Sequence, residues 1–220
     1  MRSSRWVPML GILLLLNAAT RATEITEKGR KLAEVLDRMG VEKLWKQGNY
    51  VNWDTGESLD KEVTDGKPHT HCSAFAASAA KKLGVYLLRP PGKDDPPGVK
   101  GHREKLLANA QFDWLHSCEG YAFGWRPVSS PLEAQRLANR GYLVVATFGE
   151  ANPKKSGHIA IVRPSSQRSE EEIEADGPQV IQAGMRNRAS TTLRAGFGSH
   201  KEAWENGRGV RFFAHPLDLP

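Results

Sequence analysis

Two side chains in this sequence could together carry out nucleophilic catalysis, the thiol of Cys72 and the imidazole of His158. A cysteine attacks a carbonyl carbon as its thiolate, and a free thiol titrates near pH ~8.5, so a reactive cysteine needs positive potential around it. An imidazole titrates close to neutral pH, and it can take the thiol proton and return it to the leaving group. These residues are therefore the candidate nucleophile and general base of a cysteine hydrolase.

Cys72 lies in THCSAFAASAAKKLG, residues 70–84, a segment whose composition predicts a helix. Thr70 is a favourable N-cap, the alanines favour helix, and Gly84 can end it. Cys72 would then lie in the first turn. The unpaired backbone N–H groups and the aligned peptide dipoles at a helix start favour an anion, and the same N–H groups can hold the oxyanion of a tetrahedral intermediate. This position predicts a thiolate at Cys72.

His158 opens the segment HIAIV, residues 158–162, in which a polar ring precedes a continuous apolar run. A buried imidazole needs hydrogen-bond partners. One interpretation is a core histidine whose ring nitrogens are satisfied by its neighbours, and the other is a catalytic base. The candidate nucleophile upstream favours the base.

Helices are expected in the first half of the chain and strands in the second. Apolar residues recur at three- and four-residue steps over residues 24–47 and 102–116, which predicts two amphipathic helices. Ser130 as N-cap, Pro131 at the first helical position and Gly141 after the last turn delimit another helix. The predicted strands are residues 142–148, 158–162, 179–184, 190–193 and 210–214. Helices followed by a mostly antiparallel sheet indicate an α+β fold. The first two predicted strands contain continuous apolar runs, so we expect that the sheet is covered on both faces or that these two strands lie at its centre.

The first 22 residues predict a secretory signal peptide. Two arginines precede an apolar run of about eleven residues, which is shorter than the ~20 needed to span a bilayer, and small residues follow. Cleavage would leave residues 23–220 as one domain, secreted or periplasmic and without a stable membrane span. The formal charge of +6 falls to about +3 without the leader, and this excess is too mild to indicate a nucleic-acid partner.

The two cysteines of the sequence, Cys72 and Cys118, leave a second interpretation open. In an oxidising compartment they could form a disulfide, and the domain would then be a non-catalytic module that binds wall polymer or a partner protein. His69 and His71 beside Cys72 could also ligate zinc. Because adjacent residues rarely point at one ion and the sequence has no second close pair of ligands, we predict neither a metal nor a cofactor.

The sequence around both candidate residues resembles the papain-like cell-wall cysteine hydrolases of the NlpC/P60 and CHAP group. HCSAF, residues 71–75, is similar to their Asp-Cys-Ser-Gly-Phe, and SGHIAIV, residues 156–162, is similar to their Gly-His-Val-x-Ile-Val. GYLVVA, residues 141–146, resembles the strand that precedes the histidine. The resemblance implies a papain-like α+β fold in which the nucleophile helix packs on the sheet.

The resemblance also implies a third polar residue, on the strand after the histidine, that orients the imidazole. Gln182 in QVIQAG is the candidate, because it projects from the face opposite to its apolar neighbours, and Asn187 and Asn109 are alternatives. A further residue upstream of the cysteine would help to hold the oxyanion. Tyr50 and Asn52 in NYVNWDTG are candidates for it, unless that segment is a surface turn.

The activity that the resemblance implies is that of a secreted amidase or endopeptidase. It would cleave amide bonds in peptidoglycan or in another peptide substrate, and acyl transfer to a different acceptor would use the same site. Arg186, Arg188 and Arg194 follow Gln182 in the sequence, where they could bind a carboxylate or form a solvated basic face.

Overall fold

The computed structural model describes residues 24–92, 95, 106–152, 154–203 and 209–219. The predicted signal peptide and residues 102–105 of the predicted second helix lie outside these ranges. Among the described residues, no helix combines the length and the apolar character needed to cross a membrane.

Six strands form the main sheet, in the order β3-β8-β4-β5-β6-β7, and every neighbouring pair is antiparallel. The strands are β3 (Arg126–Val128), β4 (Leu143–Phe148), β5 (His158–Val162), β6 (Gln179–Gln182), β7 (Arg188–Thr192) and β8 (Arg211–His215). A separate hairpin pairs β1 (Asn49–Val51) with β2 (Ser58–Glu62). The predicted combination of helices with an antiparallel sheet is confirmed, and β5 has the predicted bounds.

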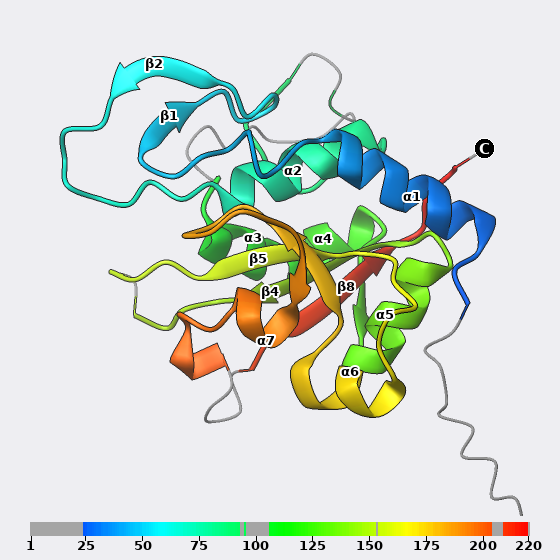
Figure 1. Ribbon diagram of the computed structural model, residues 1–220. Helices are drawn as coiled ribbons and strands as arrows, with labels where there is room; N and C mark the ends of the chain where they lie inside the picture. Colours follow the sequence, from blue (N-terminus) through cyan, green and yellow to red (C-terminus); the bar gives the residue numbers. More distant parts are fainter. Residues whose placement is uncertain (1–23, 93–94, 96–105, 153, 204–208, 220) are drawn as a thin grey trace, which may run out of the picture.

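Helices cover both faces of this sheet (Figure 1). They are α1 (Glu27–Arg38), α2 (Cys72–Lys82), α3 (Ala108–Leu115), α4 (Cys118–Ala122), α5 (Pro131–Asn139), α6 (Glu170–Asp176) and α7 (Leu193–Gly196), and a 3-10 helix spans Lys201–Ala203. In Figure 1, α1 and α2 lie above the sheet, whereas α5, α6 and α7 lie below it. The predicted covering of both faces is therefore confirmed.

Alternate residues of the central strands enter two separate apolar clusters. Ile159 of β5 belongs to the same cluster as Phe75 of α2, which we call the first cluster. Ala160, the next residue of β5, belongs with Phe197 to the second cluster, on the other face. Because side chains alternate across a strand, His158 points toward the second cluster.

The helix that carries the candidate nucleophile begins at Cys72. Its N-cap is His71 rather than the predicted Thr70, and the His71 side chain makes no capping hydrogen bond. The first nine residues of α2 are all buried, and most of them are alanine or serine, so the helix lies close against its neighbours. Gly84, with φ +72°, follows the C-cap as predicted. The predicted position of Cys72 in the first turn is confirmed.

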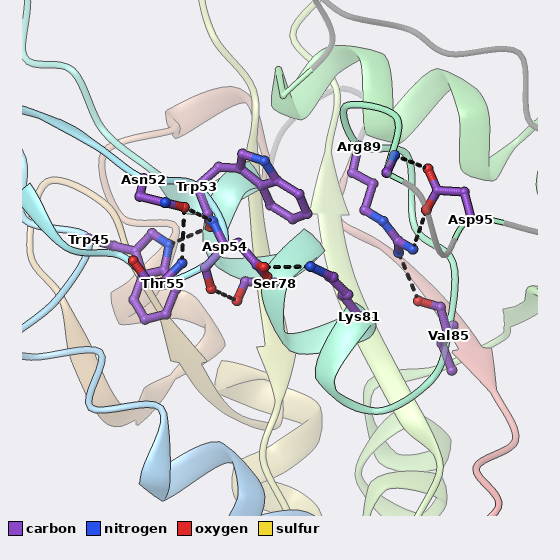
Figure 2. Close-up of polar contacts among 11 residues, drawn as sticks. Trp45, Asn52, Trp53, Asp54, Thr55, Ser78, Lys81, Val85, Arg89 and Asp95 are labelled. Carbon is purple, nitrogen blue, oxygen red and sulfur yellow. Dashed lines mark hydrogen bonds and ion pairs between the residues drawn. The ribbon is translucent and has the colours of Figure 1, made fainter. Parts of the chain in front are cut away.

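Polar contacts anchor the other end of α2 to the loop between β1 and β2 (Figure 2). Ser78 Oγ donates a hydrogen bond to the carbonyl oxygen of Asp54, and Lys81 forms an ion pair with the Asp54 carboxylate. In the same region, Trp45 Nε1 donates to the carbonyl oxygen of Trp53 at 3.0 Å. The hairpin loop therefore holds the far end of α2. This contact fixes the direction of the helix and the position of its first turn.

Two differences from the predicted secondary structure have clear local causes. The helix predicted over residues 24–47 ends at Arg38, because Gly40 adopts φ +63°, a conformation that no α-helix accommodates. Residues 170–176, which lie outside every predicted element, form α6. Its start is stabilised by a capping box in which the side chains of Ser169 and Glu172 each accept a hydrogen bond from the backbone N–H of the other residue.

Candidate active site

His158 and Gln182 form a hydrogen-bonded pair where the start of β5 meets the end of β6. His158 Nε2 lies 2.9 Å from Gln182 Oε1. The other end of the same amide, Gln182 Nε2, donates to the carbonyl oxygen of Arg186 at 3.3 Å, which fixes which way the amide faces. Because Oε1 can only accept, this network assigns the proton of the neutral imidazole to Nε2. Nδ1 is then the nitrogen that can accept a proton.

The two alternative orienting residues bind elsewhere. Asn109 Oδ1 accepts hydrogen bonds from the backbone N–H groups of Glu150 and Gly157, at 3.0 and 2.9 Å, and so holds the two ends of the loop that leads to His158. Asn187 Oδ1 accepts from the backbone N–H of Gly184, while its Nδ2 donates to carbonyl oxygens of the segment after α1. Gln182 is therefore the predicted residue that contacts the imidazole.

Cys72 reaches β5 from the face of the first cluster. Helix α2 packs against β5, and the backbone N–H of Ile159, the residue that follows His158, is one of the groups that favour a lower pKa of the Cys72 thiol. Cys72 is only 5 % exposed. Thr70, two residues before Cys72, lines the same cavity as His158. The start of α2 thus lies near the start of β5, but Cys72 belongs to the first cluster, whereas the side chains of His158 and Gln182 point to the second-cluster face of the sheet. Of the three predicted residues, the structure therefore brings His158 and Gln182 together and leaves Cys72 on the opposite face of β5.

Burial favours the neutral forms of both the thiol and the imidazole. It raises the pKa of Cys72, and this effect exceeds the opposite effect of hydrogen bonds from the backbone N–H groups of Ile159, Ser73 and Cys72 itself. Burial also lowers the pKa of His158, and the hydrogen bond with Gln182 offsets this only in part. The thiolate predicted from the helix start is therefore not favoured, because β5 and the first cluster exclude water from that start.

A second histidine, which the sequence analysis missed, stacks on His158. The rings of His158 and His200 have centroids 5.4 Å apart and planes inclined by 15°. Burial, followed by the proximity of His158, lowers the pKa of His200 to about 4. Phe197 contacts the His158 ring edge-on, with centroids 4.6 Å apart. No periodicity or motif surrounds His200 in GFGSH, so only the fold reveals this contact.

A cavity with a volume of about 420 Å³ opens over His158 and Gln182. Its lining comes from the segments before α2 and before β5, the segment after β6, and α7 with the residues that follow it. Hydroxyl groups from Thr70, Ser156 and Ser199 contribute to the lining. The cavity therefore offers polar surface next to the candidate base.

Glycines let the backbone approach the histidine–glutamine pair closely. A Cβ atom at position 196 would lie 2.6 Å from Gln182 Oε1, a distance that would force the amide to move. A Cβ atom at position 184 would lie 3.2 Å from Cε1 of His158. Gly196 and Gly184 therefore give the two side chains the room that their hydrogen bond needs.

Both cysteines are free thiols in the structure, Cys72 buried and Cys118 exposed. The disulfide of the second interpretation is therefore not formed. Its absence leaves the Cys72 sulfur available for chemistry.

The remaining candidates near Cys72 have local roles. The Asn52 side chain accepts hydrogen bonds from the backbone N–H groups of Asp54 and Thr55, so this segment is the surface turn that was one of its two interpretations. His69 pairs with a carboxylate and His71 with a backbone carbonyl. Within the described residues, no group of three or more potential metal ligands comes together.

Comparisons with known proteins leave the function to be argued from this geometry. No protein-family model matches the chain, and no curated protein is significantly similar to it in sequence.

Proposed function

We propose that this protein is a cysteine amidase or endopeptidase of papain-like architecture. The observation that supports the proposal most strongly is that Cys72, the first residue of α2, belongs to the same apolar cluster as Ile159 of β5. The next residue back along β5 is His158, whose ring is held by Gln182. A buried thiol, an imidazole with a free acceptor nitrogen and a group that orients the imidazole are the components of nucleophilic catalysis by cysteine.

In the acylation step, the His158 imidazole must turn from the second-cluster face of β5 toward the start of α2, and its Nδ1 then accepts the proton of the Cys72 thiol as the sulfur attacks the carbonyl carbon of the scissile amide. Because both groups are neutral at rest, proton transfer accompanies attack rather than precedes it. Cys72 and Ser73 are the first two residues of α2, and their backbone N–H groups, which have no partner within the helix, would stabilise the oxyanion of the tetrahedral intermediate. The intermediate collapses to a thioester as His158 donates the proton to the departing amine.

In the deacylation step, His158 accepts a proton from a water molecule as the water oxygen attacks the thioester carbonyl carbon. The second tetrahedral intermediate expels the Cys72 sulfur, which regains its proton, and releases the carboxylic acid. In the resting structure, Gln182 Oε1 holds the Nε2–H and so leaves Nδ1 as the basic nitrogen of the ring. As an amide it orients the ring without adding charge.

The substrate that we propose is peptidoglycan, with cleavage in the stem peptide or at the link between glycan and peptide. Support comes from the resemblance of HCSAF and SGHIAIV to the NlpC/P60 and CHAP hydrolases and from the predicted secretory signal. The protein would therefore act outside the cytoplasm, in the periplasm or after secretion.

Replacement of the nucleophile tests the proposal. We expect Cys72→Ala to lower the release of soluble fragments from purified peptidoglycan at least ~10³-fold while the circular dichroism spectrum is unchanged. Cys118→Ala is the matched control, because it removes the other free thiol at an exposed site. It should keep full activity.

Equal activity of the wild-type protein and Cys72→Ala would refute the proposal. If wild-type protein binds peptidoglycan but releases no fragments, the protein is a binding module. The sites of cleavage, read from the fragment masses, would then distinguish an amidase from an endopeptidase.

A further inference from the structure

The cavity over His158 and Gln182 has a distinctive charge. Arg186 is the only lysine, arginine, aspartate or glutamate among the residues that line it, counted over the described part of the chain. Within that part, no carboxylate lies within ion-pair distance of its guanidinium. The two histidines of the lining have lowered pKa values, so neither supplies a second cation near neutral pH. Among the described residues, the guanidinium of Arg186 is therefore the one fixed charge of the cavity lining, and no carboxylate is paired with it.

The position of Arg186 is tied to the candidate catalytic pair. Its backbone carbonyl oxygen accepts the hydrogen bond from Gln182 Nε2, the same amide whose Oε1 holds His158. A guanidinium presents several N–H donors in a planar fork that matches the two oxygens of a carboxylate. The hydroxyl groups of Thr70 and Ser199 line the same cavity and can donate further hydrogen bonds to an anion.

We propose that this cavity, which His158 lines, binds a carboxylate of the substrate, and that Arg186 is the residue that recognises it. The inference rests on the proposed function, and it deepens that function by naming the substrate class as acidic peptides. Arg186 is a specificity residue here and takes no part in proton transfer.

A pair of stem peptides that differ in one group tests this inference. In one peptide the carboxylate adjacent to the scissile bond is free, and in the other it is a carboxamide. We expect wild-type protein to cleave the free carboxylate form with a kcat/KM at least ~10-fold higher, the value of one charge-assisted contact. Arg186→Gln should abolish this preference by raising KM for the acidic peptide, and should change kcat/KM for the amide less than about twofold.

Arg188→Gln is the matched control. Arg188 is an exposed arginine only two residues further along the chain, and it does not line the cavity. This variant should keep the preference for the acidic peptide. If Arg186→Gln changes kcat/KM equally for both peptides, or changes it for neither, the inference is wrong.

Binding measurements separate this inference from the proposed function. Calorimetric titration of the Cys72→Ala protein with the same two peptides measures recognition without chemistry. Tighter binding of the acidic form that depends on Arg186 supports the inference even if wild-type protein cleaves neither peptide, an outcome that would refute the hydrolase alone. Equal binding of both forms, or no binding of either, would overturn the inference.

Discussion

The starts of α2 and α4 present the same arrangement in two different surroundings. Each helix has a free cysteine as its first residue, Cys72 in α2 and Cys118 in α4. At α4 the N-cap Ser117 accepts a hydrogen bond from the backbone N–H of Gly120, and the cysteine is exposed. At α2 the N-cap makes no side-chain hydrogen bond, and β5 covers the thiol.

A helix start therefore does not by itself make a cysteine reactive. The partial charges of the first turn act on both sulfurs, but only Cys72 packs against a strand that begins with a buried imidazole, that of His158. Burial raises the pKa of the Cys72 thiol and so opposes formation of the thiolate. The start of α2 therefore depends on a base to remove the proton, a requirement that the environment of Cys118 does not meet.

Removal of the group that orients this base should have the largest effect. We expect Gln182→Leu to lower kcat about 10²-fold with little change in KM, because the His158 ring loses the acceptor that fixes its tautomer and direction. Gln179→Leu is the control, since Gln179 lies on the same strand but bonds to Ser190 instead. If kcat of Gln182→Leu equals that of the control, Gln182 has no orienting role.

The reactivity of the two thiols should differ by a smaller factor. We expect iodoacetamide at pH 8 to alkylate Cys118 at least ~10-fold faster than Cys72, because the latter is only 5 % exposed and burial raises its pKa. Mass spectrometry of proteolytic fragments measures each site separately, and unfolding in urea should make the two rates similar. Faster alkylation of Cys72 in the native protein, especially at pH 6, would show that the helix start stabilises a thiolate after all.

The elements around the site follow from local sequence signals. The N-cap of α5 is Ser130, whose hydroxyl accepts a hydrogen bond from the backbone N–H of Glu133, and Gly141 adopts φ +89° after the helix, as the spacing predicts. The apolar run HIAIV gives β5 its bounds because both of its faces are buried. Such signals are short in range, and a single sequence contains them.

The surroundings of the thiol and the imidazole depend on contacts between distant segments. The pairing of Gln182 with His158 was predicted because both lie on adjacent strands with known side-chain alternation. The stacking of His200 was not, because α7 brings that residue back over β5 without any pattern in the sequence. The direction of the Cys72 pKa shift was wrong for a similar reason, since the helix start is visible in the sequence and its covering by β5 is not.

The stacked rings of His158 and His200 should also make the fold sensitive to acid, which is the smallest effect that we predict. The pKa of His200 is about 4 in the folded protein, against 6.5 for the unperturbed side chain. Between these values the unfolded chain binds more protons, so the free energy of unfolding should fall as the pH drops from about 6.5 toward 4. The contribution of His200 is present in full above pH 6.5 and is lost at about pH 4.

His200→Phe keeps an aromatic ring against His158 and removes this titration. Urea unfolding at several pH values between 7 and 4 should therefore give a shallower pH dependence for the variant. The difference in slope should stay below about 1.4 kcal/mol per pH unit, the limit for one proton, because solvent reaches part of the His200 ring and weakens the effect. His158, whose pKa is also lowered by burial, remains in both proteins and preserves part of the slope. Identical slopes would mean that the stacked ring is protonated as readily in the folded protein as in the unfolded chain.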